Sequence, residues 1–213
     1  MLRAASKREP GDVKAQILSK RTVRGAERYL IQSCSVMARL IAQHGPCTLA
    51  DREFQPFQTL ATSIINQQLS AKAANTIERR VQAIVPGLTP SAFLAVRHDE
   101  LRAAGLSSAK VRYIVDLAQR VSNGRLSLEA MLQAPEGDVI SALFELPGIG
   151  QWTAEMFLIF GLRRPDVLSL GDAGLQRAVR LLFGDDATLD RVGQSWHPYC
   201  SVASWYLWRH LDS

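Results

Sequence analysis

The sequence has few cysteines, no long apolar run and almost no β-strand pattern. Its three cysteines, Cys34, Cys47 and Cys200, are widely spaced and include no C-x-x-C pair, which argues against a disulfide framework, a transition-metal site or an iron–sulfur cluster. No stretch approaches the ~18 consecutive apolar residues that a membrane span requires, and the first 25 residues lack the apolar block of a signal peptide. We therefore expect an intracellular, cytoplasmic protein without membrane contact, transition metal or cofactor.

The sequence also lacks the motifs of common small-molecule enzymes. It has no glycine-rich nucleotide-binding loop, no cluster of metal ligands and no recognisable Ser/His/Asp constellation. The histidines are scattered along the chain, and we assign them no catalytic role (His44, His98, His197 and His210). An enzyme of small-molecule metabolism is therefore the least favoured interpretation.

What remains is the composition of a basic globular protein. The 213 residues are 47% apolar, enough for one large domain or two small lobes that share a core. Basic residues outnumber acidic ones by 25 to 20, a net charge of +5, and twenty of the basic residues are arginine. This balance suits a polyanionic partner, because arginine binds phosphate through bidentate donors, but it can equally reflect the composition of a genome. Residues 1–25 are expected to be a basic, flexible segment, either a frayed terminus or an arm on nucleic acid.

Helical periodicity runs through almost the whole chain. Apolar residues recur at three- and four-residue spacing, and serine, proline and glycine stand where caps and breaks are expected. Ser70 is predicted to cap one helix, and Ser107 or Ser108 another. These helices, without internal repeat, predict an all-α fold. The expected helical segments are 26–45, 55–69, 70–85, 90–96, 98–105, 108–124, 127–134, 137–146, 150–162, 172–184 and 198–211.

The segment LPGIG at residues 146–150 joins two amphipathic helices by a very short turn. Glycines allow positive φ and carry no Cβ, so an outside backbone can approach Gly148 and Gly150 closely. The amides that open the next helix have no intrahelical partner and lie at the positive end of its dipole, where phosphate binds. Ile149 between the glycines would anchor the turn in the core. The pattern favours DNA binding over a plain helix pair with a tight loop.

Asp172 directly precedes an amphipathic helix, in the position of an N-cap. Capping and catalysis are compatible, because amide hydrogen bonds and the helix dipole both favour an ionised carboxylate. An anion at the edge of a cleft could steady a developing cation, so the position is either a simple cap or a catalytic carboxylate. Asp166, Asp185 and Asp186 lie nearby in evident loops and are much weaker candidates.

Aromatic residues concentrate at two places in the sequence. Three of the four tryptophans, Trp196, Trp205 and Trp208, fall in the last eighteen residues, and the fourth, Trp152, shares a helix face with Met156 after the hairpin. Such stripes usually form core. Tryptophan is also the best flat wall for a cationic ring, so part of this set could line a pocket for an electron-poor base.

Five segments in this order resemble the helix-hairpin-helix superfamily of DNA base-excision glycosylases, most closely the 3-methyladenine DNA glycosylase II branch. They are IINQQLSAKAA (64–74), GLSSAKVRYIVDLA (105–118), LPGIGQWTAEMFL (146–158), DVLSLGDAGLQRAV (166–179) and WHPYCSVASWYLWR (196–209). The resemblance implies two helical lobes with an active-site cleft between them. The terminal lobe is expected to comprise residues 26–69 and 166–213, and the central lobe residues 70–165, with the helix-hairpin-helix at 138–161.

The resemblance also assigns roles to individual residues. Asp172 falls at the position of the superfamily's essential aspartate, and Trp152 stands where lyase-competent members hold a Schiff-base lysine. Gln68 and Leu69 match the wedge that fills the gap left by an extruded base. The remaining implied roles are a base pocket at Trp152, Met156 and Trp208, DNA backbone contacts at Pro147, Gly148, Ile149, Gly150 and Thr153, and a monovalent cation, Na⁺ or K⁺, on the main chain of Leu146 and Gly148.

The function implied by the resemblance is that of a monofunctional DNA glycosylase. Such an enzyme flips alkylated purines, of the 3-methyladenine and 7-methylguanine type, out of double-stranded DNA and hydrolyses the N-glycosidic bond in base excision repair. We expect a monomer that acts at the nucleoid. Two alternatives stay open: a glycosylase for deaminated or oxidised bases, and a non-catalytic helix-hairpin-helix module that only binds DNA.

Overall fold

The fold is helical throughout the part of the chain that the structure describes. The structure, a computed structural model, describes residues 16–51 and 53–213, and these residues form α-helices, short 3₁₀ turns and one π-helical turn but no strand. The all-α prediction is confirmed. Among the same residues, no helix combines the length and the apolar character needed to cross a membrane.

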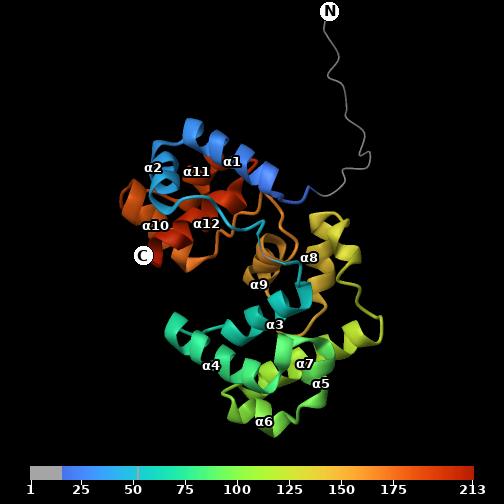
Figure 1. The fold of residues 1–213 in the computed structure, drawn as a ribbon. Coiled ribbons are helices and arrows are strands. Elements are labelled where there is room, and N and C mark those ends of the chain that lie inside the picture. The colour runs from blue at the N-terminus through green and yellow to red at the C-terminus, as the bar shows by residue number, and fades with distance from the viewer. Residues whose placement is uncertain (1–15, 52) are drawn as a thin grey trace, which may run out of the picture.

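Twelve α-helices follow one another in these two ranges (Figure 1). They are α1 (Lys20–Ser33), α2 (Ser35–His44), α3 (Pro56–Asn66), α4 (Ala71–Ile84), α5 (Pro90–Ala95), α6 (His98–Ala103), α7 (Ser108–Ser122), α8 (Glu136–Phe144), α9 (Gln151–Met156), α10 (Ala173–Phe183), α11 (Leu189–Gly193) and α12 (Cys200–Leu211). The shorter turns are η1 (Pro86–Leu88), η2 (Ala130–Leu132), the π-helical η3 (Phe157–Gly161) and η4 (Gln194–Trp196).

The helices are arranged in two lobes (Figure 1). In one lobe, α1 and α2 from the start of the chain pack on α12 from its end, beside α10 and α11. In the other, α5 and α6 pack on α7, and α4 packs on α6. Helix α3 contacts α4, α7, α9 and η3, which all lie within residues 70–165. We predicted residues 56–66 in the terminal lobe, whereas these contacts place α3 with the central helices.

Side-chain caps start two helices where the sequence predicts them. Ser70 Oγ accepts a hydrogen bond from the amide of Ala73 and begins α4, and Ser107 Oγ accepts one from the amide of Lys110 and begins α7. Each cap satisfies an amide without an intrahelical partner and stabilises its helix by about 1 kcal/mol. Ser70 thereby also fixes the direction in which the chain leaves the turn after α3.

The first predicted helix, residues 26–45, is two helices in the structure. Its backbone becomes extended at Cys34 (φ −150°, ψ 114°), which lets α2 turn and pack on α12. Helix α1 begins earlier than predicted, at Lys20, so residues 20–25 are helical and do not belong to a flexible arm. Residues 1–15 of that predicted arm lie outside the described residues.

Two further helix predictions need correction. Residues 127–134 contain only the short 3₁₀ turn at Ala130–Leu132, and α11 is a helix that the sequence analysis did not predict. Both are elements of a single turn or little more. Apolar periodicity is a weak signal over so few residues, because it needs at least two turns to repeat.

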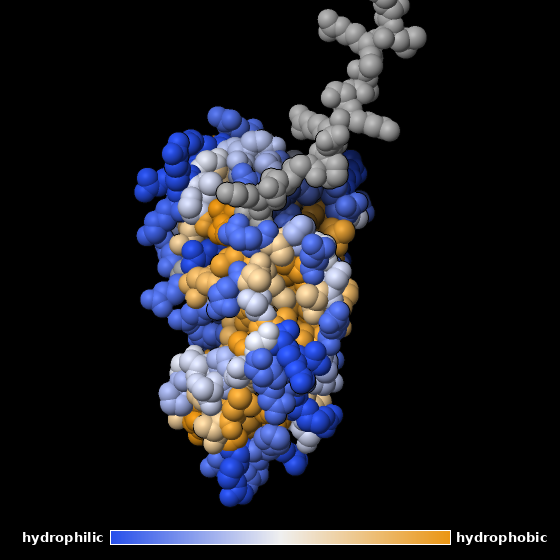
Figure 2. Space-filling view, turned by 90° about the vertical axis from the view of Figure 1, so that its right-hand side faces the viewer, coloured by the Kyte–Doolittle hydropathy of each residue, from blue (hydrophilic) through white to orange (hydrophobic). Residues whose placement is uncertain are grey.

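One continuous apolar core runs through both lobes. Trp196 and Tyr206 are fully buried in the terminal lobe, and Phe93 and Ile114 in the central lobe. Burial of each such side chain stabilises the fold by roughly 1.5–3 kcal/mol. On the face shown in Figure 2, hydrophilic residues cover both ends and apolar residues reach the surface in patches across the middle. The two lobes therefore share a core and can hold a site between them.

Candidate active site

The hairpin between α8 and α9 presents bare main chain to solvent. Pro147, Gly148 and Gly150 are exposed, whereas Ile149 is buried and its amide donates to the carbonyl oxygen of Leu146 (3.2 Å). Gly150 is the N-cap of α9, and no side chain caps this helix. The first amides of α9 are therefore available to an anion such as a phosphate.

Gly148 is required both by the conformation of the hairpin and by its neighbour. Its φ of +81° is a left-handed value that favours glycine, and a Cβ added there would lie 2.2 Å from Cδ2 of Tyr113 on α7. At Gly150, by contrast, an added Cβ would meet nothing within 4 Å. The first glycine shapes the hairpin, and the second leaves its surface open.

The turn after α3 projects one residue into solvent. Helix α3 ends at Asn66, and Gln68 adopts a left-handed backbone conformation (φ 57°) and is exposed, while Leu69 is half-buried. Of the two wedge candidates, Gln68 is therefore better placed to enter a duplex. The turn and the hairpin together line a hollow of about 520 Å³, formed by Asn66, Gln67, Gln68, Leu69, Gly148, Gly150, Gln151, Trp152 and Thr153.

Two side chains that the sequence analysis missed hold this turn against the hairpin. The carboxamide of Gln67 donates to the carbonyl oxygen of Gly148 (2.8 Å) and to Oγ1 of Thr153 (3.0 Å). Lys110 Nζ donates to the carbonyl oxygens of Ile65 (2.8 Å) and Gln67 (2.7 Å), at the end of α3. Partial burial lowers the pKa of Lys110. The turn at residues 67–69, called the wedge turn after the role predicted for Gln68 and Leu69, and the hairpin are thus one hydrogen-bonded unit.

The carboxylate of Asp172 is held from three sides. Asp172 is the N-cap of α10, where Oδ1 accepts a hydrogen bond from the amide of Leu175 (2.8 Å). Oδ1 also accepts from Nε1 of Trp208 (3.1 Å), and Oδ2 accepts from Nε1 of Trp152 (2.7 Å). The residue is only 8% exposed. Three N–H donors and a helix N-terminus stabilise a negative charge and fix its orientation.

A buried carboxylate fastens the loop that carries Asp172. Ser169 Oγ in this loop donates to Glu155 on α9, and the carboxamide of Gln151 donates to Oε1 of the same Glu155 (2.7 Å). Ser169 and Glu155 are both buried. Helix α9 therefore positions Asp172 twice, through Glu155 and through the indole of Trp152.

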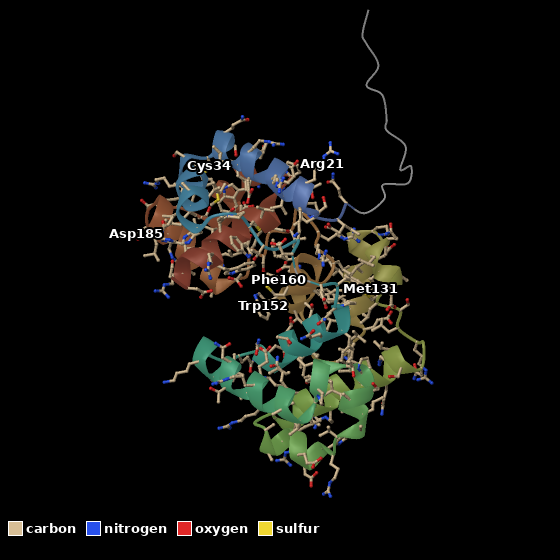
Figure 3. All side chains as sticks on the ribbon, in the orientation of Figure 1. Arg21, Cys34, Met131, Trp152, Phe160 and Asp185 are labelled. Carbon is tan, nitrogen blue, oxygen red and sulfur yellow. The ribbon has the colours of Figure 1, made fainter. Side chains whose placement is uncertain are left out.

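A hollow of about 600 Å³ opens beside Trp152. Its apolar wall is formed by Trp152, Met156 and Phe160, from α9 and the π-helical turn that continues it. Figure 3 shows Trp152 and Phe160 together in the space between the two lobes. The polar lining comes from Glu53, Gln55, Gln58, Thr59, Thr62, Ser63, Asn66 and Glu78. A volume of this size and a mixed lining are typical of sites that bind small organic groups.

Trp208 does not line this hollow. The ring centroids of Trp208 and Phe160 are 5.5 Å apart, and the two rings line a second hollow of about 400 Å³. The predicted pocket of Trp152, Met156 and Trp208 therefore needs correction, because Phe160 takes the third place on the wall and Trp208 instead contacts Asp172. A π-helical turn, which often marks a functional site, carries Phe160 and has no recognised sequence signal.

The order of these elements matches a known protein family. Residues 61–194 match the family described as HhH-GPD superfamily base excision DNA repair protein. The chain belongs to this family. The matched range contains the wedge turn, the hairpin and Asp172, and the α8–α9 pair overlaps residues 138–161, which are predicted to form the helix-hairpin-helix of this HhH-GPD protein.

Three relatives show how far the similarity extends. Bacillus subtilis YfjP is 32% identical over 173 residues, which make up 75% of this chain and 60% of that protein. The crystal structure of a DNA-3-methyladenine glycosidase from Bacillus halodurans is 37% identical, with a TM-score of 0.68, over 92% of this chain and 90% of that one. The structure of the Schizosaccharomyces pombe 3-methyladenine DNA glycosylase in complex with abasic DNA is 26% identical, with a TM-score of 0.73, over 89% and 97%. The HhH-GPD chain thus spans about 60% of the length of YfjP but nearly all of the two solved chains.

One role expected of the HhH-GPD hairpin fits its atoms poorly. Thr153 is 3% exposed and its hydroxyl accepts a hydrogen bond from Gln67, so its side chain is not free for the predicted DNA contact. The carbonyl oxygens expected to bind a monovalent cation each accept one hydrogen bond, that of Leu146 from Ile149 and that of Gly148 from Gln67. Each of these oxygens keeps a second lone pair, and the cation stays a prediction.

Proposed function

We propose that this protein is a monofunctional DNA glycosylase that releases alkylated purines from double-stranded DNA. The observation that carries the proposal is the Asp172 carboxylate, held by the indole N–H groups of Trp152 and Trp208, of which Trp152 also lines an aromatic hollow. The names of the Bacillus halodurans and Schizosaccharomyces pombe relatives support the same substrate class. We further propose that it acts as a monomer on DNA in the cytoplasm, at the nucleoid.

The mechanism follows from the leaving group. A purine methylated at N3 or N7 already carries positive charge, so it departs with the electron pair of the N-glycosidic bond without prior protonation. The sugar that remains resembles an oxocarbenium cation, and the fixed anion of Asp172 stabilises it. Oδ2 accepts one hydrogen bond, from Trp152, and keeps a lone pair for the sugar or for the attacking water. Water adds to the anomeric carbon, and its proton passes to solvent.

DNA recognition divides among three parts of the site. The amides at the start of α9 bind a backbone phosphate, which gives affinity without sequence preference. Gln68 fills the space that the extruded nucleotide leaves in the duplex. The extruded base stacks against the wall of Trp152 and Phe160, while Gln58 and Ser63, which also line the hollow, supply hydrogen-bonding groups to its edge.

The proposal predicts base release without strand cleavage. Trp152 offers no amine for a Schiff base, so incubation with methylated duplex DNA should release 3-methyladenine and 7-methylguanine and leave intact strands that break only after alkali treatment. Chromatography of the released bases and gel analysis of the strands measure the two halves separately. Release of hypoxanthine or an oxidised base instead would show that the substrates are deaminated or oxidised bases and not alkylated purines. Duplex binding without release of any base would show that the protein is a non-catalytic DNA-binding module.

Gln67 is predicted to be a positioning residue that acts through the wedge turn and the hairpin. Gln67→Ala removes two hydrogen bonds worth about 1 kcal/mol each, so affinity for lesion-containing duplex should fall on the order of tenfold. Binding is measured by fluorescence anisotropy, with the exposed Gln133→Ala as the matched control. Unchanged affinity and an unchanged rate of base release in Gln67→Ala would remove Gln67 from DNA recognition.

A further inference from the structure

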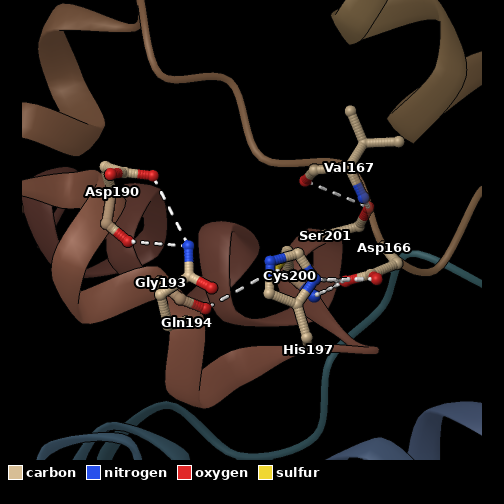
Figure 4. A network of polar contacts seen from close by, with 8 residues as sticks. All are labelled: Asp166, Val167, Asp190, Gly193, Gln194, His197, Cys200 and Ser201. Carbon is tan, nitrogen blue, oxygen red and sulfur yellow. Dashed lines mark hydrogen bonds and ion pairs between the residues drawn. The ribbon is translucent and has the colours of Figure 1, made fainter.

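Three side chains with metal-ligating atoms meet where the chain enters α12. Nδ1 of His197 lies 2.8 and 2.9 Å from the two carboxylate oxygens of Asp166, and 3.5 Å from Sγ of Cys200 (Figure 4). One ligand atom from each residue lies within 4.8 Å of the other two. None of the three residues lines the hollows of the candidate active site.

Two of the three spacings between these atoms are close to those around a tetrahedral metal ion. Ligands bound at zinc–sulfur and zinc–nitrogen distances near 2.3 and 2.0 Å lie about 3.3 to 3.6 Å apart. The distance of 3.5 Å between His197 Nδ1 and Cys200 Sγ already falls in this range. The distance of 2.8 Å between His197 Nδ1 and Asp166 Oδ2 is shorter, so these two atoms would have to move slightly apart. His197 and Asp166 have the freedom for it, since their side chains are 44% and 31% exposed.

We propose that Asp166, His197 and Cys200 form a binding site for one divalent metal ion of the Zn²⁺ class, with water in the fourth position. Cysteine sulfur, imidazole nitrogen and carboxylate oxygen are the three ligand types that Zn²⁺ takes in proteins. Two anionic ligands and one neutral imidazole balance the charge of the ion, so the partly buried complex is neutral overall.

Metal binding at this site releases one proton. Burial raises the pKa of the Cys200 thiol, and the nearby Asp166 carboxylate raises it further, so the free site holds a protonated thiol. The metal–sulfur bond forms as the S–H bond breaks and the proton goes to solvent. Any hydrogen on Nδ1 of His197 is lost as Nε2 takes one from solvent, which changes only the tautomer.

The site joins two segments that supply the candidate active site. The amide of Cys200 donates to Oδ1 of Asp166 (3.2 Å), and Ser201 Oγ accepts from the amide of Val167 (3.0 Å). The segment that begins at Asp166 leads to Asp172, and the helix that begins at Cys200 carries Trp208. A metal ion would therefore fasten the carboxylate loop to the helix that holds it. The cysteine spacing argues against a transition-metal site, and it does not reveal this cluster because Asp166 is 31 positions from His197 and only His197 and Cys200 are close in the sequence.

Cobalt titration of the whole protein tests the proposal without any glycosylase assay. Co²⁺ should bind one equivalent and produce a thiolate-to-cobalt charge-transfer band, which Zn²⁺ removes by displacement. Zn²⁺ should also raise the midpoint of thermal unfolding. Cys200→Ser should abolish the band, and His197→Asn should weaken binding at least tenfold. Cys34→Ser and Cys47→Ser, which change the other two thiols, should leave the band unchanged.

Two results would contradict the proposal: no charge-transfer band with the wild-type protein, or a band that survives in Cys200→Ser. Either result would mean that the three residues only form hydrogen bonds at the start of α12. Circular dichroism establishes that each variant is folded, and His197→Asn decides the matter if Cys200→Ser is not. The test measures a metal–thiolate signal, so its outcome for the metal site does not depend on whether the protein releases bases.

Discussion

Asp172→Asn is expected to bind lesion-containing duplex DNA almost as well as the wild type and to release methylated base on the order of 10²- to 10³-fold more slowly. Asparagine keeps the size of the side chain and remains a good N-cap for α10. It loses the charge that stabilises the sugar cation. Its amide group must also point an N–H toward one of the two indole donors, from Trp152 or Trp208.

Single-turnover release of 7-methylguanine from a defined duplex measures this effect, and anisotropy with the same duplex measures binding. Asp190→Asn is the matched control, because Asp190 is an exposed carboxylate in the first turn of α11. The control should keep the wild-type rate. Base release by Asp172→Asn at the wild-type rate would assign Asp172 to capping alone.

Gly148→Asp is expected to weaken binding to all duplex sequences alike, by tenfold or more at physiological salt. A side chain at Gly148 meets the Tyr113 ring at 2.2 Å, and the left-handed backbone adds strain of about 1–3 kcal/mol. The new carboxylate would also stand beside a DNA phosphate. Loss of hairpin shape and like-charge repulsion therefore act in the same direction.

Two further variants separate the contributions of shape and charge. Gly150→Asp adds the same charge where a Cβ meets nothing and φ is negative, so it should weaken binding while leaving thermal stability nearly unchanged. Gly148→Ala adds only the methyl group and should lower thermal stability. Wild-type affinity in Gly148→Asp, with the fold intact by circular dichroism, would contradict a role of the hairpin in DNA binding.

The sequence predicts the helices of this protein best where each has a local signal. Ser70 and Ser107 cap helices as predicted, because a cap depends on one side chain and an amide three residues away. The break at Cys34 has no such signal: the apolar pattern continues across it, and only packing of α2 on α12 accounts for it.

The candidate site shows the same division between local and distant signals. Asp172 and Trp152 were predicted from motifs, and the structure joins them by a hydrogen bond. Phe160 and Gln67 were missed, because their roles depend on a π-helical turn and on a contact with Gly148, which is 81 positions from Gln67. Such contacts are fixed by tertiary packing, which the periodicity of a single segment does not encode.

These contacts suggest how the site gains its rigidity. Lys110 and Gln67 connect the wedge turn to the hairpin, and Trp152 and Glu155 connect the helix that follows the hairpin to the loop of Asp172. The start of α9, the wedge turn and the Asp172 carboxylate are therefore linked by direct hydrogen bonds. A preorganised site of this kind requires little rearrangement of its charges during the reaction.

The central claim, that Asp172 stabilises a cationic sugar, is tested most directly with two abasic-site analogues in otherwise identical duplexes. One carries a positively charged pyrrolidine and resembles the transition state, and the other carries a neutral tetrahydrofuran. We predict that the wild type binds the charged analogue at least tenfold more tightly and that Asp172→Asn loses this preference. Equal affinity of the wild type for the two duplexes would contradict the account.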